Sequence, residues 1–272
     1  MLLFTSDLDR TLIYSNYMME RYPPISNKVV VERKEDAVIS MMTESTTSLL
    51  ERVNMETLFV PVTTRALHQY ERIHFIKELR PALAITTNGG TILENGQPNE
   101  AWARLLRQRI EDTAIPDADM LKRFEAMQDD QWLLESFYVD DLFYVYHVDL
   151  QIFQQETLAL LIAEFDKLGW HVLLQGKKLY FLPKVLTKEA AIAYMKENCR
   201  YNVHVAAGDS TMDYGMLAMA DYGYTPLHGD MKDKQPAKLL NTHYSQLNGS
   251  DFTEELLHDV LRLVAEQGVH NR

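Results

Sequence analysis

Short apolar runs alternate with amphipathic segments along most of the chain. The runs MLLFTS at 1–6 and TLFVPVTTR at 57–65 are apolar stretches that end in polar residues, which is typical of buried parallel strands. A helical pattern follows over 66–79, and PALAITTNGG at 81–90 predicts another strand that a glycine pair ends. The alternation predicts an α/β fold built on a parallel sheet.

Two segments between the first two strands have patterns of their own. The segment VVVERKEDAVIS at 29–40 contains two β-rich runs around a charged turn, so we predict a hairpin with Lys34 to Asp36 near its tip. A helix is predicted over 44–53.

The middle of the chain, about 91–182, has its own mixture of elements. The pattern predicts helices at 100–112, 117–127 and 155–169, a strand at 142–148, and two turn-separated strands within 171–182. This combination favours an independent α+β module.

After this module the alternation of strands and helices resumes. The pattern predicts helices at 188–199, 212–220 and 251–267, and strands at 203–209 and 222–226. The simplest interpretation is a doubly wound, Rossmann-like core formed by 1–87 and 183–272, interrupted by an inserted α+β domain at 88–182.

The charge balance of the chain limits its partners. The 272 residues carry a formal net charge of -12, which disfavours nucleic acid and anionic membrane surfaces. The single cysteine, Cys199, fits a reducing compartment. No basic, apolar leader precedes Asp7, and no apolar stretch approaches the ~18 residues of a membrane span. We therefore expect a cytoplasmic monomer or homodimer.

Acidic residues follow the predicted strands. Carboxyl ends of parallel strands gather at one edge of a sheet, so these acids are expected to meet: Asp7, Asp9, Asp209 and Asp213. Carboxylates crowded together repel one another unless a cation compensates, and hard oxygen ligands favour Mg²⁺. For Asp213, a role as a helix cap is the simpler alternative.

One lysine stands where a cation is unfavourable by itself. Lys188 begins a predicted helix and opposes the helix dipole, so an anionic group is expected in front of it. Thr63 after the second strand offers a hydroxyl donor. Acids, a metal and phosphate donors together indicate phosphoryl transfer. Lys184 is the alternative phosphate contact to Lys188, and Thr64 the alternative to Thr63.

Four short motifs occur in a fixed order: DLDRT, VTTR, LTKEAA and GDSTMD. With TTNGG before the inserted domain, the chain resembles the haloacid dehalogenase superfamily of phosphatases, over nearly its whole length. It is similar in particular to the Cof-like branch with sucrose-phosphate and mannosyl-3-phosphoglycerate phosphatases.

The resemblance implies a role for each acid. Asp7 would be the nucleophile that forms an aspartyl-phosphate, and Asp9 the general acid and base. Mg²⁺ would be bound by Asp7, the backbone carbonyl of Asp9 and Asp209, with Asp213 as a further ligand or a supporting acid.

The resemblance also implies the phosphate contacts. Thr63, Thr64 and Lys188 would hold the phosphate. Arg65 is a candidate hinge residue or a residue on a helix face, and Asn88 a candidate substrate contact or simply a turn residue.

Three positions depart from the family pattern. Arg10 and Thr64 stand where glycine is common, and Met212 stands where asparagine is often found. The side chain of Arg10 must point away from the site or reach toward the substrate.

The inserted domain lies where the family carries its cap, and the hairpin lies where it carries its flap. The resemblance therefore implies a Mg²⁺-dependent phosphatase for a small phosphate ester, such as a sugar or polyol phosphate. Two alternatives stay open: a sugar phosphomutase similar to phosphomannomutases, which would depend on a sugar bisphosphate, and a non-catalytic metabolite-binding protein of the same fold.

Overall fold

The computed structural model describes residues 1–129, 131–231 and 237–270. The chain forms two compact units, Met1–Asn99 with Lys188–Arg272, and Glu100–Thr187. The sequence predicted an inserted domain at 88–182, whereas the contacts within the chain place the second unit at Glu100–Thr187. Residues 88–99 join the first unit because β6 (Thr91–Glu94) pairs with β5 (Leu83–Thr86).

The first unit is built on a five-stranded sheet with the order β14-β13-β12-β1-β4, in which every pairing is parallel. Its strands are β1 (Leu2–Ser6), β4 (Leu58–Pro61), β12 (Val203–Ala207), β13 (Tyr222–Thr225) and β14 (Thr242–Tyr244). All residues of β1 are buried, which explains its uninterrupted apolar run. The predicted doubly wound α/β core is confirmed.

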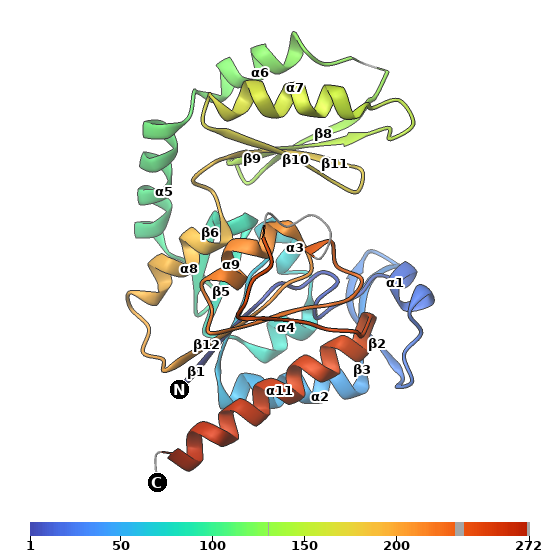
Figure 1. Ribbon diagram of the computed structural model, residues 1–272, viewed down its shortest axis with the longest axis vertical. Coiled ribbons are helices and arrows are strands. Elements are labelled where there is room, and N and C mark those ends of the chain that lie inside the picture. Colours follow the sequence, from blue (N-terminus) through green and yellow to red (C-terminus); the bar gives the residue numbers. More distant parts are fainter. Residues whose placement is uncertain (130, 232–236, 271–272) are drawn as a thin grey trace. The chain divides into compact units, whose positions relative to one another are not determined.

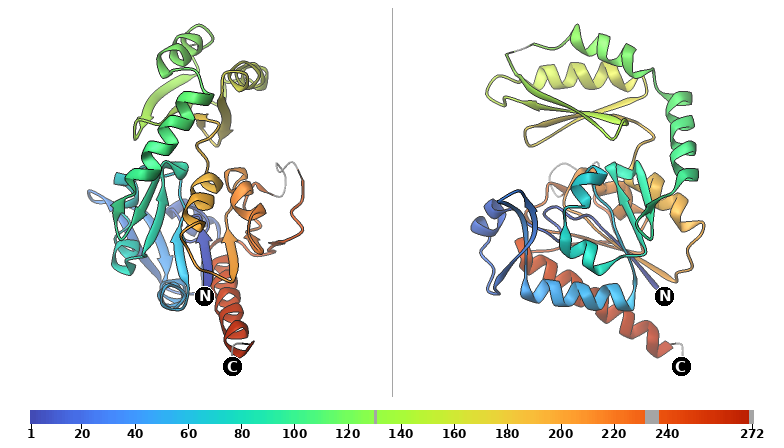
Figure 2. Two further views of the ribbon diagram at one scale, coloured as in Figure 1. Left: turned by 90° about the vertical axis from the view of Figure 1, so that its left-hand side faces the viewer. Right: turned by 180° about the vertical axis from the view of Figure 1, so that it is seen from behind.

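Helices cover both faces of this sheet. On one face, α2 (Glu44–Glu56) and α11 (Gly249–His270) lie side by side (Figures 1 and 2), and their apolar residues share one core cluster with Phe4 of β1. On the other face, Lys196 of α8 (Lys188–Lys196) contacts His204 of β12. The helix α9 (Tyr214–Ala218) packs against β12 and β13. In sheets of this kind a site is expected at the carboxyl ends of the strands.

The predicted hairpin is confirmed as β2 (Lys28–Lys34) and β3 (Ala37–Thr43), which pair antiparallel around a turn. Glu35 in this turn has a left-handed backbone, with φ 54°. A short helix that the sequence did not predict, α1 (Asn16–Arg21), precedes the hairpin.

The single helix predicted over 66–79 is wrong. The structure has two short helices, α3 (Leu67–Tyr70) and α4 (His74–Leu79). Between them Ile73 leaves the helical region, with φ -76° and ψ 86°, and forms a β-bridge with Glu32 of β2. Burial of the Ile73 side chain and this bridge outweigh the local helical pattern.

The second unit is an α+β module, as predicted. Its four-stranded antiparallel sheet has the order β10-β11-β9-β8. The elements are α5 (Glu100–Thr113), α6 (Asp117–Glu125), β8 (Leu133–Val139), β9 (Phe143–Val148), α7 (Gln155–Asp166), β10 (Trp170–Gln175) and β11 (Lys178–Pro183). Aromatic side chains such as Phe124 and Phe181 form its core. The sequence missed β8, whose residues are mostly exposed and lack alternation.

The described part of the first unit also contains three short elements: β7 (Gln97–Pro98) and the 3₁₀ turns η1 (Thr87–Gly89) and η2 (Thr211–Asp213). The helix predicted over 212–220 is therefore a 3₁₀ turn followed by the short helix α9. Within the described residues, none of the helices combines the length and the apolar character that a membrane span needs.

His204 makes the stability of the first unit depend on pH. Burial, and then the nearby Lys196 ammonium, lower the pKa of His204 to about 4, from an ordinary value of 6.5. The unfolded chain takes up this proton below pH 6.5, whereas the folded chain does not until pH 4. We therefore expect His204 to stabilise the fold above this range and to cost it about 3 kcal/mol as the pH falls from 6.5 to 4.

Urea unfolding of the parent and of His204→Gln at pH 4, 5, 6 and 7 measures this loss. The pKa of His228 is also lowered to about 4 by burial, so both proteins lose stability in acid. The variant should lose less, and equal losses would contradict the assignment to His204.

Candidate active site

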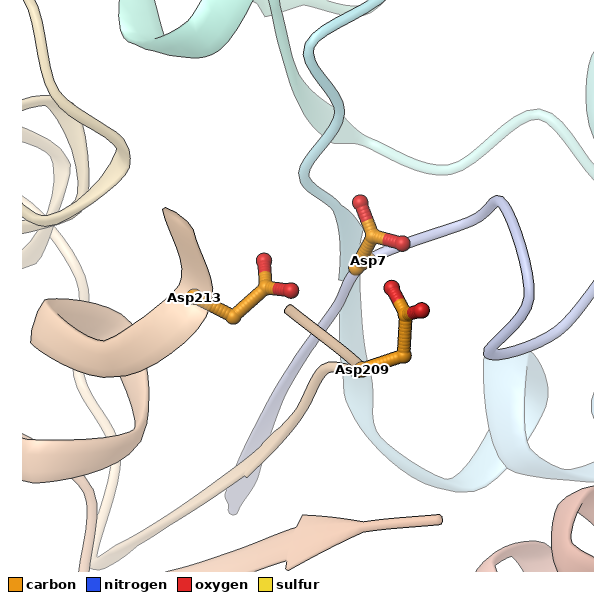
Figure 3. A group of neighbouring side chains, drawn as sticks. All are labelled: Asp7, Asp209 and Asp213. Carbon is orange, nitrogen blue, oxygen red and sulfur yellow. The ribbon is translucent and has the colours of Figure 1, made fainter. Parts of the chain in front are cut away.

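Three acids from distant parts of the chain meet at the carboxyl edge of the sheet. Asp7 follows β1, and its N–H donates to the carbonyl of Ala207 at 2.9 Å. Asp209 follows β12, and Asp213 ends η2. The side chains of Asp7, Asp209 and Asp213 point toward one another (Figure 3), with one oxygen of each within 4.8 Å of the others. All three are buried.

Lys188 lies against this cluster. Its Nζ donates to Asp7 Oδ1 and to Asp213 Oδ1, both at 2.6 Å, and the residue is 1% exposed. Although burial opposes it, the carboxylates of Asp213 and Asp7 raise the pKa of Lys188, which keeps the ammonium charged. The alternative lysine, Lys184, pairs instead with Asp166 at 2.6 Å.

Asp213 is held by two further donors. Its Oδ2 accepts hydrogen bonds from the N–H and the hydroxyl of Ser210 at 3.0 and 3.1 Å. The side chain therefore does not cap α9. Gly208 makes this approach possible, because a Cβ at that position would lie 2.4 Å from the Cβ of Asp213.

The cluster holds more negative charge than its neighbours balance. Burial, together with the carboxylates of Asp213 and Asp9, raises the pKa of Asp7 to about 7, although Lys188 opposes the rise. Burial and the carboxylate of Asp7 raise the pKa of Asp209, with Arg10 opposing. Within the described residues, Asp209 Oδ2 accepts no hydrogen bond. Three buried carboxylates with a free lone pair form a donor set that suits a hard divalent cation.

The carboxylate of Asp9 is directed elsewhere. Arg65 donates to it through Nε and Nη2, at 2.6 and 2.8 Å, and 48% of the Asp9 side chain is exposed. The two acids of the DLDRT motif are thus separated: Asp7 belongs to the buried cluster, while Asp9 forms a bidentate pair with Arg65.

Arg10 adopts a left-handed backbone, with φ 63°, a conformation that glycine adopts without cost. Its Nε lies 3.3 Å from Asp209 Oδ2, and its Nη2 donates to the carbonyl of His228 at 2.7 Å. The Nε2 of His228 lies 2.8 Å from the carbonyl of Arg10. The side chain of Arg10 therefore points toward the acids.

The VTTR motif lies beside Asp7. Val62 donates its N–H to the carbonyl of Ser6 at 2.8 Å, which brings the buried Thr63 to the same edge. Thr63 Oγ1 accepts the N–H of Arg65 at 3.1 Å, so the hydroxyl proton can still be donated to a ligand. Thr64 is half-buried.

Asn88 has a left-handed backbone, with φ 57°, and is buried. Its N–H donates to the carbonyl of Thr63 at 3.0 Å. The structure thus gives Asn88 the geometry of a turn residue that braces the Thr63 loop. Met212 lies within η2, between the residues that carry the last motif.

Sequence reasoning missed Glu32, Ser40 and Ser210, which are all buried. Ser210 lies inside the GDSTMD motif, and its position beside Asp213 was the available signal. Glu32 had a weaker signal, since it follows three valines and opens the charged stretch of the predicted turn.

Comparisons with known proteins bear on this site. The family model of sucrose-6F-phosphate phosphohydrolase matches residues 1–225. No curated protein sequence matches the chain.

Solved structures are similar over nearly the whole chain. A sucrose-phosphatase from a Synechocystis species, in complex with sucrose and phosphate, is 17% identical, with TM-score 0.67. The match covers 95% of this chain and 97% of that chain. A phosphatase of the haloalkanoate (HAD) enzyme superfamily from Bacteroides thetaiotaomicron is 14% identical, with TM-score 0.61 and coverage of 95% and 94%. A trehalose-6-phosphate phosphatase from Aspergillus fumigatus is 12% identical, with TM-score 0.52 and coverage of 95% and 92%. At these identities the likenesses establish the fold.

Proposed function

Because this chain belongs to the sucrose-6F-phosphate phosphohydrolase family, and is by that membership a phosphatase, we propose that it hydrolyses a small sugar or polyol phosphate with Mg²⁺. One observation carries the proposal: Asp7 lies in a buried acidic cluster with the Lys188 ammonium 2.6 Å from its carboxylate. Solved relatives of the fold are named as sucrose- and trehalose-6-phosphate phosphatases, which supports a sugar phosphate as the substrate.

In the proposed reaction, a carboxylate oxygen of Asp7 attacks phosphorus and the bond to the ester oxygen breaks. Asp9 gives its proton to the departing alcohol, which leaves an aspartyl-phosphate on Asp7. A water then attacks phosphorus and gives a proton to Asp9. The bond to Asp7 breaks, and inorganic phosphate and the free carboxylate result.

The other residues of the cluster have proposed roles in binding. Asp7, Asp209, Asp213 and the backbone carbonyl of Asp9 would hold Mg²⁺, which supplies positive charge for the transferring phosphoryl group. Lys188 and the hydroxyl of Thr63 would hold the phosphate oxygens, with Thr64 as a further donor. We propose that the unit Glu100–Thr187 is the cap that selects the leaving group.

A panel of phosphate esters, assayed for phosphate release with and without Mg²⁺, tests this function. We expect turnover of sugar or polyol phosphates, and a loss of about 100-fold or more when EDTA removes the metal, because three carboxylates would then repel the substrate. A phosphoserine peptide serves as a control that a site for small esters should not hydrolyse.

Two results would contradict the proposal. Dependence on a sugar bisphosphate, with little phosphate released, would identify a mutase. Ligand-dependent thermal stabilisation without hydrolysis of any ester would identify a binding protein.

A further inference from the structure

A buried carboxylate of the hairpin is linked to Asp9, the proposed acid and base, through a single residue, Arg65. Glu32 of β2 is 0% exposed, and such a charge is stable in the interior only when it is paired and hydrogen-bonded. Its Oε2 accepts from Arg65 Nη1 at 2.7 Å and from Ser40 Oγ at 2.8 Å. Its Oε1 accepts from Arg72 Nη2 at 3.1 Å. Both oxygens are thus satisfied.

The guanidinium of Arg65 connects this carboxylate to Asp9. Nη1 binds Glu32, while Nε and Nη2 bind the two oxygens of Asp9. Nη2 also donates to Ser40 Oγ at 3.2 Å. Since a guanidinium is a rigid plane, fixing Nη1 fixes the direction in which the other two nitrogens face Asp9.

Almost half of the Asp9 side chain is exposed, and both of its oxygens accept hydrogen bonds from Arg65. Arg65, by contrast, is 11% exposed in its side chain and anchored on the buried side by Glu32 and Ser40. The buried contacts of Arg65 with Glu32 and Ser40 therefore determine where the exposed carboxylate of Asp9 lies.

We propose that Glu32 is a positioning residue for Asp9, acting through Arg65, so that the hairpin β2–β3 sets the geometry of the general acid and base. The inference rests on the proposed function. Without the negative charge of Glu32, Arg65 is held only by its weaker contact with Ser40, and the direction of the Asp9 carboxylate is no longer fixed. Proton transfer suffers, while phosphate binding by Lys188 and Thr63 does not.

The test is Glu32→Gln, which keeps the size of the side chain and removes its charge. With a sugar phosphate, we expect kcat to fall about 10- to 100-fold and KM to change less than about twofold. Glu32→Asp, which keeps the charge, should recover part of kcat. Val31→Ala, on the same strand and also fully buried, is the control for loss of packing and should keep the parent kcat.

A second readout separates the two chemical steps. With p-nitrophenyl phosphate the leaving nitrophenolate needs no proton, so the first step stays fast in Glu32→Gln. The second step still needs Asp9 to take a proton from water. Rapid mixing should therefore show a burst of about one nitrophenolate per enzyme in the variant, followed by slow turnover.

Several results would overturn the inference. They are an unchanged kcat, a loss that Val31→Ala reproduces, a change in KM alone, or a slow phase without a burst. A crystal structure of Glu32→Gln that keeps both Arg65–Asp9 hydrogen bonds at 2.6 and 2.8 Å would also overturn it. Failure of the proposed function looks different, since the parent protein would then release no phosphate from any ester.

Discussion

Replacing Asp7 with Asn is expected to abolish Mg²⁺-dependent phosphate release, with kcat reduced by about 10⁴-fold or more. The amide is a poor nucleophile toward phosphorus and a weak metal ligand, so the change removes two proposed roles at once. Steady-state assays with the best ester of the panel measure the loss. Acid quench of the parent during turnover should trap phosphate on the chain, and the variant should trap none.

Stability separates loss of chemistry from loss of fold in this variant. Burial and the neighbouring acids raise the pKa of Asp7 to about 7, so without metal the ionisation of Asp7 lowers the stability of the fold as the pH rises toward 7. Asn removes this cost but also removes one of the two carboxylates that pair with Lys188, and the two effects oppose each other. We expect Asp7→Asn to melt within a few degrees of the parent without Mg²⁺ and to gain less from added Mg²⁺. Asp259→Asn, at an exposed ion pair of α11, is the matched control. Activity above a tenth of the parent in Asp7→Asn would refute the nucleophile assignment.

Lys188→Met should be the most destabilising change at the site. Lys188 neutralises Asp7 and Asp213 in a buried setting, and removing one member of such a cluster leaves unpaired charge that costs about 3–5 kcal/mol. We also expect kcat to fall about 10²- to 10³-fold, because a donor to the transferring phosphoryl group is lost. Urea unfolding at pH 7 and steady-state kinetics measure the two effects.

A second substitution shows whether the instability comes from the carboxylates. Adding Asp213→Asn to Lys188→Met removes one uncompensated charge and should recover much of the stability without restoring kcat. Lys184→Met, at an exposed pair with Asp166, should leave the urea midpoint close to that of the parent, since solvent screens such a pair, and should leave kcat intact. If Lys184→Met lost activity and Lys188→Met did not, the phosphate contact would have to be reassigned.

Local patterns in the sequence predicted the core of the fold. Strands buried on both faces, such as β1, are continuous apolar runs that leave few other interpretations. The same reasoning failed for β8, whose residues are mostly exposed, and at Ile73, where pairing with Glu32 interrupts a helical pattern. The two failures have different causes. β8 pairs with the neighbouring strand β9 but has no buried alternating face to reveal it, whereas Ile73 pairs with a residue that lies far away along the chain.

In the candidate site, too, some contacts could be predicted from the sequence and others could not. Strand ends and motif order were sufficient to predict that Asp7, Asp209, Asp213 and Lys188 lie together, and the structure brings them together. The pair between Arg65 and Asp9 spans 56 positions, and that between Arg65 and Glu32 spans 33. No spacing rule indicates such pairs, because they depend on how the hairpin folds back over the loop after β4.

The position of β1 between β12 and β4 in its sheet has a consequence for synthesis of the chain. β1 can pair with β4 early, but its other edge bonds to β12, and the Lys188 that neutralises Asp7 is 181 positions away. While the ribosome makes the intervening segment, an apolar strand keeps one open edge, which invites pairing with other nascent chains. Chaperone binding to this edge would protect the chain until β12 emerges.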